Sequence, residues 1–125
     1  MGNLEFKNNK YFAGNWVEAG KDHRGWFLGS FFEEGSPLKT ENVEVFYCEH
    51  NAGDMCNAHY HQEKVEVIIL LEGMAKYSVN GNENTLKSGD FLFVDVNNVI
   101  EGEYFEASKI ISIHSPSIPS DKVVV

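Results

Sequence analysis

Basic residues are scarce in this 125-residue chain, which has 10 lysines and arginines against 19 aspartates and glutamates. The formal net charge at pH 7 is therefore -9. Nucleic acids and acidic membrane surfaces are negatively charged, so a protein of this charge is repelled by both. We therefore expect no nucleic-acid partner and attribute the acidity to solubility.

Long apolar runs are also missing. The run VEVIILL has seven residues and is interrupted by Glu66, whereas a membrane-spanning helix needs about 20. The first residues, MGNLEFKNNK, lack the apolar stretch of a signal peptide, and Phe6 breaks the N-myristoylation pattern. These absences predict a cytoplasmic protein with no membrane partner.

Cysteine occurs only twice, as Cys48 and Cys56, and neither has the close partner spacing of a zinc knuckle. In a reducing compartment such cysteines are free thiols, and cysteine is often buried. We expect both to be free thiols, with one or both buried.

Helical periodicity, internal repeats and low-complexity tracts are absent too. The sequence shows nine or ten short alternating or apolar segments separated by turn residues, such as 42–50, 67–71 and 75–79, the last followed by Asn80-Gly81. This pattern predicts an all-β sandwich or barrel with little or no helix. Residues 11–20 suit a short edge strand and 26–32 an aromatic strand.

The length and the hydrophobic content of 42% suit one folded domain over residues 1–125. Residues 1–10 read as a polar lead-in. Residues 115–125 contain prolines that exclude a central strand, and they end in three valines. We expect them to form an arm packed on the outside of the domain or across a dimer partner.

Candidate metal-binding side chains cluster between Gly53 and Gly73. His59 and His61 stand two residues apart, so on a strand both imidazoles leave the same face. Glu66 follows at an odd spacing and reaches that face only if the chain turns, for which the polar tripeptide 62–64 is suited. Two imidazole nitrogens and one carboxylate would then form a partial ligand shell for a divalent metal.

The spacing of Gly53, His59, His61, Glu66 and Gly73 resembles the first motif of the cupin superfamily at every fixed position. That resemblance implies an antiparallel jelly-roll β-barrel, often with one metal held by these His and Glu residues and a further His from a second motif. The second motif matches at Gly89-Asp90 but departs from the family afterwards. Asp95 stands where the second motif usually has Pro, and Asn97 stands where it has Gly. Ile100 stands where it has its last metal-binding His.

We therefore predict a metal site made of His59, His61 and Glu66, with Zn, Mn, Fe or Ni as the divalent transition metal. Glu63 is the alternative carboxylate if the turn is shorter. The same three residues could instead form a metal-free hydrogen-bonded cluster.

We assign the remaining histidines and aromatic residues to packing or to the surface. The alternation around His114 places Ile111 and Ile113 on the core face, which would leave His114 at the surface or against the C-terminal arm. Tyr77 and Phe93 could line the cavity, although filling the core is the more common use of aromatic side chains. His23 and His50 lie at strand ends and are assigned no function.

The leading functional hypothesis is a metal-dependent isomerase or epimerase acting on a small polar, carbohydrate-like substrate, with the metal as Lewis acid. Asp22-x-Arg24-Gly25 and the Pro-Ser…Asp-Lys tail resemble small cupins that isomerise nucleotide-linked sugars, although Cys56-Asn57-Ala58 stands where those proteins place an Arg. Two alternatives remain: a non-haem iron oxygenase, because the ligand set resembles a facial triad, and a non-catalytic ligand-binding or sensory cupin. A homodimer is expected.

Overall fold

The structure is a computed structural model that describes residues 10–125. The polar lead-in predicted for residues 1–10 lies outside this range except for Lys10. Ten strands and one helix are found in the described residues: α1 (Trp16–Gly20), β1 (Trp26–Leu28), β2 (Glu44–His50), β3 (Met55–Tyr60), β4 (Val65–Glu72), β5 (Met74–Val79), β6 (Asn82–Lys87), β7 (Phe91–Val94), β8 (Ile100–Tyr104), β9 (Ser108–Ser115) and β10 (Val123–Val124).

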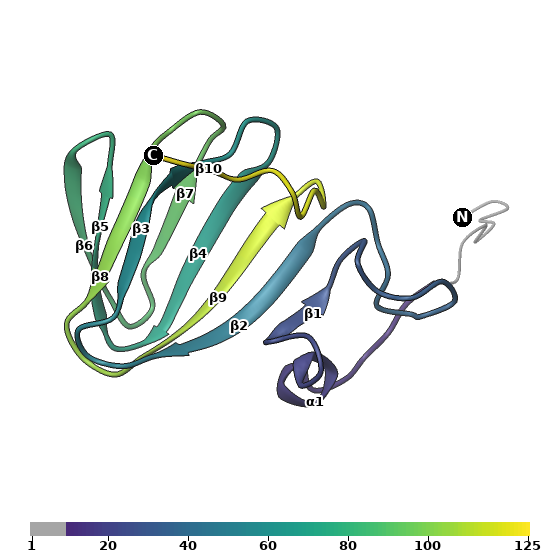
Figure 1. Cartoon of the computed structure of the whole chain (residues 1–125). Helices are drawn as coiled ribbons and strands as arrows, with labels where there is room; N and C mark the ends of the chain where they lie inside the picture. The colour runs from purple at the N-terminus through teal and green to yellow at the C-terminus, as the bar shows by residue number, and fades with distance from the viewer. Residues whose placement is uncertain (1–9) are drawn as a thin grey trace, which may run out of the picture.

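The strands form two antiparallel sheets of five strands each, in the orders β1-β2-β9-β4-β7 and β10-β3-β8-β5-β6. Figure 1 shows the two sheets facing each other, with α1 and β1 beyond β2 at one side. This arrangement confirms the predicted all-β jelly roll. Within residues 10–125 the two sheets remain separate ladders, so the shell is a two-sheet barrel rather than a continuously bonded cylinder.

The hydrophobic core lies between the sheets. Its buried members come from six strands: Ile68, Leu70, Ala75, Tyr77, Leu86, Val94, Ile100, Tyr104 and Ile110. They follow the period of two expected for strands with one face inward. The core therefore fills the middle of the barrel and leaves the end nearest Glu66 to polar side chains.

Tight turns hold the strand order. Asn80 and Gly81 have positive φ angles of 52° and 84° and join β5 to β6, as the sequence predicted. Gly73, with φ 108°, separates β4 from β5, and a Cβ there would lie 2.1 Å from Ser108 Oγ. A glycine is therefore required at this last position of the first motif.

Two local predictions were wrong. Residues 11–20 contain no strand but the single-turn helix α1, because the Asn15 side chain accepts hydrogen bonds from the N–H groups of Val17 and Glu18 at 3.0 and 3.1 Å. The aromatic strand predicted for 26–32 ends at Leu28. The chain turns beyond it, where Phe32 N–H bonds to Gly29 O.

The C-terminal arm returns to the barrel after β9. Its last strand, β10, pairs with the edge of β3, so Val123 lies opposite Tyr60 and Val124 opposite His59. This edge position agrees with the expectation that the prolines exclude a central strand. Cys48 and Cys56 are both free and partly buried. The single helix in residues 10–125 is far too short to span a membrane.

Candidate functional site

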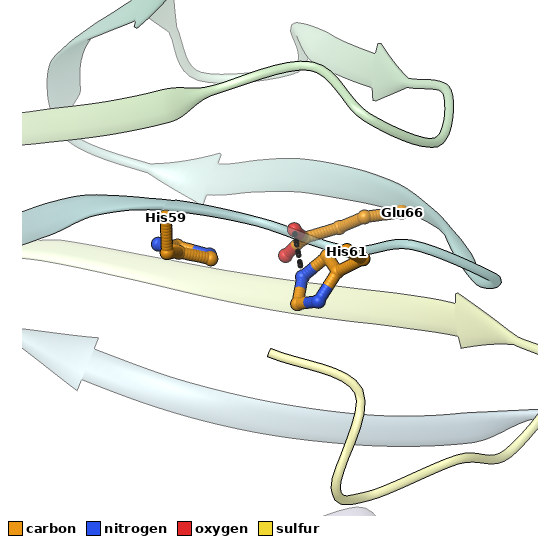
Figure 2. Close-up of side chains that lie close together, drawn as sticks. All are labelled: His59, His61 and Glu66. Atoms are coloured by element: carbon orange, nitrogen blue, oxygen red, sulfur yellow. Dashed lines mark ion pairs between the residues drawn. The ribbon is translucent and has the colours of Figure 1, made fainter. Parts of the chain in front are cut away.

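His59, His61 and Glu66 meet inside the barrel, as the spacing predicted. One ligand atom from each lies within 4.8 Å of the others, and all three residues are buried. Figure 2 shows the two histidines on one stretch of chain and Glu66 reaching toward them from β4. Glu63, the alternative carboxylate, is exposed in the turn and lies outside the cluster.

The turn that brings Glu66 back to the histidines is held by the C-terminal arm. The Asp121 carboxylate accepts hydrogen bonds from the backbone N–H groups of Gln62, Glu63 and Lys64 at 2.8, 2.8 and 2.9 Å. These bonds satisfy three turn donors that the strands leave unpaired. A residue about sixty positions away thus fixes the bend on which the site depends.

The backbone also sets the tautomer of both histidines. His59 Nδ1 lies 2.8 Å from Asn57 O, and His61 Nδ1 contacts Asp121 O. A carbonyl oxygen only accepts, so each Nδ1 carries the proton and each Nε2 keeps its lone pair when the ring is neutral. This carbonyl-bonded imidazole is the usual arrangement of a metal-ligating histidine.

Two polar atoms of the cluster make no hydrogen bond and approach only each other, as the dashed line in Figure 2 marks. His61 Nε2 and Glu66 Oε1 are buried, lie 3.3 Å apart, and make no hydrogen bond. Buried polar atoms are nearly always satisfied, and a cation between a lone-pair nitrogen and a carboxylate oxygen would satisfy both. The residues therefore fit a divalent metal with nitrogen and oxygen ligands, although they do not identify it.

His114 was predicted at the surface or against the C-terminal arm, and the surface position is wrong. It is 6% exposed, and its Nε2 lies 3.0 Å from Glu66 Oε2. Strand β9 buries the face that carries Ser108, Ile110, Ser112 and His114. Because Ile residues occupy both faces of this strand, hydrophobicity alone did not identify the inner one.

A buried polar network continues behind His114. Its Nδ1 lies 3.2 Å from Glu44 Oε1, and the Lys64 ammonium donates to the same oxygen. Ser117 Oγ–H donates to Glu44 Oε2 at 3.1 Å. Every charge in this network has an opposite charge beside it, which a buried ion requires.

The network shifts the protonation of the cluster. Burial alone would raise the pKa of Glu66, but the neighbouring His114 and His61 rings, together with the Ser112 hydroxyl, hold the pKa well below its usual value. Burial would lower the pKa of His61, but Glu66 and the Asp121 carbonyl raise it instead. Burial lowers the pKa of His59. Glu66 is therefore an anion and His59 a neutral ligand at neutral pH.

A cavity of about 850 Å³ opens beside the cluster and runs between the sheets. Tyr77 lines it, as predicted, and its hydroxyl contacts that of Tyr104. Burial, outweighing the hydrogen bond from Tyr77, raises the pKa of Tyr104 to about 12. Phe93 is 53% exposed on the outside, so it occupies neither the cavity nor the core, the two places considered for it.

Two histidines that were assigned no function, His23 and His50, also line the cavity. Ile100 lines it directly beside His59, its cross-strand partner, and supplies no ligand atom. Three protein ligands would leave coordination positions for water or substrate, as catalytic metal sites require.

Comparison with protein families gives a match to the cupin domain over residues 46–102, which includes the whole His59–His61–Glu66 cluster. Comparison with curated proteins gives no significant match.

Solved structures share the fold at low sequence identity. An uncharacterized Klebsiella pneumoniae protein with a double-stranded β-helix domain is 21% identical, with a TM-score of 0.64 over 70% of this chain and 78% of that one. KdgF from Halomonas sp. is 18% identical, with a TM-score of 0.61 over 63% and 73%. Streptomyces Pac13, described as a unique nucleoside dehydratase, is 13% identical, with a TM-score of 0.62 over 69% and 70%. At these identities the likeness concerns the fold alone.

Proposed function

We propose that this chain, which matches the cupin domain over residues 46–102 and shares the fold of cupin-like structures, is a metal-dependent isomerase or epimerase of a small polar, carbohydrate-like molecule. The observation that carries the metal site is the pair of unsatisfied buried atoms, His61 Nε2 and Glu66 Oε1. His59 supplies the third ligand from the same strand. A divalent metal bound there would polarise a carbonyl or enediolate oxygen of the substrate as a Lewis acid.

The cavity suits a molecule with both polar and apolar faces. Trp26 and Phe46 line it with rings 4.4 Å apart, and aromatic walls pack against the C–H faces of a ring. The nucleoside dehydratase Pac13 shares this fold, so a barrel of this kind can enclose a sugar-containing molecule. These features support the carbohydrate-like substrate class.

We propose that Tyr77 is the hydrogen-bond donor to the substrate. Its hydroxyl is buried in the cavity against that of Tyr104, and burial raises its pKa, so it stays protonated at neutral pH. Such a hydroxyl would donate a hydrogen bond to a substrate oxygen and stabilise the negative charge that develops there when a proton leaves the neighbouring carbon. A base takes that proton from one carbon and returns it to the next, so the isomerisation needs no external oxidant.

Metal analysis after reconstitution tests the proposal, with His59→Ala and His61→Ala as variants. We expect about one divalent metal per wild-type chain and a loss of metal in both variants. His50→Ala is the matched control, because His50 lines the same cavity outside the cluster. A wild-type protein that holds no metal after reconstitution would refute the site. Deuterium uptake from D2O at a carbon of candidate ketoses and aldoses tests the reaction.

The second candidate, a non-haem iron oxygenase, is favoured by the donor set itself, two histidines and one carboxylate. It predicts a preference for iron(II) and oxygen consumption with a substrate. An oxygen electrode that records no uptake across the substrate panel counts against it. The third candidate, a non-catalytic ligand-binding cupin, is favoured by Ile100, and it predicts ligand binding without turnover.

The homodimer and the cytoplasmic location stay predictions. The homodimer is supported by the outer face of β4 and β7, where Phe93 lies opposite Val67 and Phe91 opposite Ile69. Phe91 and Phe93 are 66% and 53% exposed. Sedimentation equilibrium tests this prediction, because a monomer has a mass of 14.1 kDa.

A further inference from the structure

Two cationic side chains from distant parts of the sequence line the same cavity as the His59–His61–Glu66 cluster. Arg24 belongs to the loop between α1 and β1, and Lys122 belongs to the C-terminal arm just before β10. Both residues are exposed. Arg24 is also the single arginine in the sequence.

Neither side chain has a partner within residues 10–125: no hydrogen bond and no ion pair involves the Arg24 guanidinium or the Lys122 ammonium. Four other exposed or half-exposed lysines do reach carboxylates, namely Lys21, Lys39, Lys76 and Lys109. In a protein of net charge -9, these two unpaired cations line a cavity whose other charged side chains are Lys64 and the acidic Asp22, Glu44 and Glu66, and Lys64 is already paired with Glu44. The two unpaired cations are free to bind an anion.

The backbone fixes the place of Arg24. Its φ is 53°, a conformation that residues other than glycine rarely adopt. Gly25 packs directly on β2, because a Cβ there would lie 2.3 Å from Tyr47 O, and its own carbonyl accepts the Tyr47 N–H at 3.0 Å. Unfavourable backbone conformations held by their surroundings concentrate at ligand sites.

Lys122 is fixed from both sides. Asp121 before it is tied to the turn at residues 62–64, and Val123 after it pairs with Tyr60. The backbone of Lys122 is therefore held beside β3, the strand that carries His59.

Asp22 is the exposed acidic residue that lines the cavity with these cations, and no ion pair joins it to Arg24. It leaves an excess of one positive charge among these three exposed side chains. The Asp22 carboxylate would repel an anion, so removing its charge should strengthen anion binding, whereas removing a cation should weaken it.

We propose that Arg24 and Lys122 bind an anionic group, a carboxylate or a phosphate, on the molecule whose other end reaches His59, His61 and Glu66. The guanidinium offers two parallel N–H donors to such a group, and the ammonium adds a point charge. This inference rests on the proposed function, and it narrows the substrate from a carbohydrate-like molecule to an acidic or phosphorylated one.

Nuclear magnetic resonance tests the proposal directly, because one arginine gives one side-chain Nε–H resonance. Wild-type protein is titrated with inorganic phosphate, glucose 6-phosphate, glucuronate and glucose. We expect the Arg24 resonance to shift with the anions and not with glucose. If glucose 6-phosphate binds more tightly than glucuronate, the anionic group is a phosphate, and the reverse order identifies it as a carboxylate. Equal responses to charged and neutral sugars, or no response to any anion, would overturn the proposal.

The variants Arg24→Gln and Lys122→Gln are expected to raise the Kd of the better charged sugar at least about tenfold, which is the loss of one charge-assisted hydrogen bond. Asp22→Asn is expected to lower it. Lys87→Gln is the matched control, because Lys87 is an exposed lysine outside the cavity. An equal effect from Lys87→Gln would show a general charge effect and would contradict a defined site.

Failure of this inference is separable from failure of the proposed function. Metal content of Arg24→Gln is expected to equal that of wild type, because Arg24 lies outside the cluster. His61→Ala is expected to lose metal and still bind the anion. Anion binding without metal would therefore sustain this inference alone, and metal without anion binding would overturn it alone.

Discussion

Glu66 Oε2 lies 3.0 Å from His114 Nε2, across the ladder in which these two residues are direct partners on β4 and β9. Ser112 Oγ–H donates to the same oxygen at 2.8 Å. One oxygen of the carboxylate is thus fully occupied, while Oε1 faces His61. His114 is a positioning residue that decides which oxygen of Glu66 is offered to a ligand.

His114→Ala is expected to weaken metal binding by about 10- to 100-fold without changing the stoichiometry, as losses around metal ligands do. The physical reason is that Glu66 Oε2 would be held by Ser112 alone, while His59, His61 and Glu66 all remain. Competition with a chromophoric chelator measures the affinity.

The matched control is His50→Ala, which removes an imidazole from the far end of β2 along the same cavity. Wild-type affinity is expected for this control. A His114→Ala protein that is folded and binds metal as tightly as wild type would show that His114 does not position Glu66.

The cluster could be predicted from sequence because its geometry is local. His59, His61 and Glu66 are seven positions apart at most, so the strand period and one turn determine their directions. His114 could not be placed in the same way, because its contact with Glu66 depends on the register of β9 against β4. That register is set by tertiary packing and not by a nearby pattern.

The same distinction separates the correct and incorrect parts of the fold prediction. Asn80-Gly81 predicted its hairpin because the turn type follows from those two residues. The Tyr11–Gly20 segment was assigned to a strand from its aromatics, and the cap formed by Asn15 was missed. The contacts of Asp121 with the turn at 62–64 join residues far apart in the sequence, so no local pattern could predict them.

Asp121→Asn is expected to destabilise the protein by about 2 kcal/mol at pH 7, because three backbone N–H groups lose a charged acceptor. Burial would raise the pKa of Asp121, but those N–H groups hold the pKa below its usual value. A depressed pKa adds stability above the unfolded value of about 3.9, and this stability disappears as the pH falls further. Urea unfolding at pH 7, 5 and 3 should therefore show a difference between wild type and variant that shrinks at pH 3.

Asp90→Asn is the control for this pH dependence. The Asp90 carboxylate accepts one exposed hydrogen bond from Lys87 N–H at 3.0 Å, so a change of only about 0.5 kcal/mol is expected. An Asp121→Asn protein as stable as the Asp90→Asn protein at pH 7 would contradict the role given to the arm.

Ile100→His is expected to tighten metal binding, because the new imidazole would stand beside His59 as its cross-strand partner on β8. Side chains of directly opposed residues lie about 5 Å apart, which is within reach of a shared metal. The position is also where the cupin resemblance places its last histidine. A fourth ligand should lower the metal Kd at least about tenfold, and burying an imidazole should cost about 2 kcal/mol of stability. Ile100→Thr is the control, since it introduces a polar group without a nitrogen ligand. If Ile100→His binds metal no more tightly than Ile100→Thr, the coordination positions that His59, His61 and Glu66 leave unfilled do not face β8.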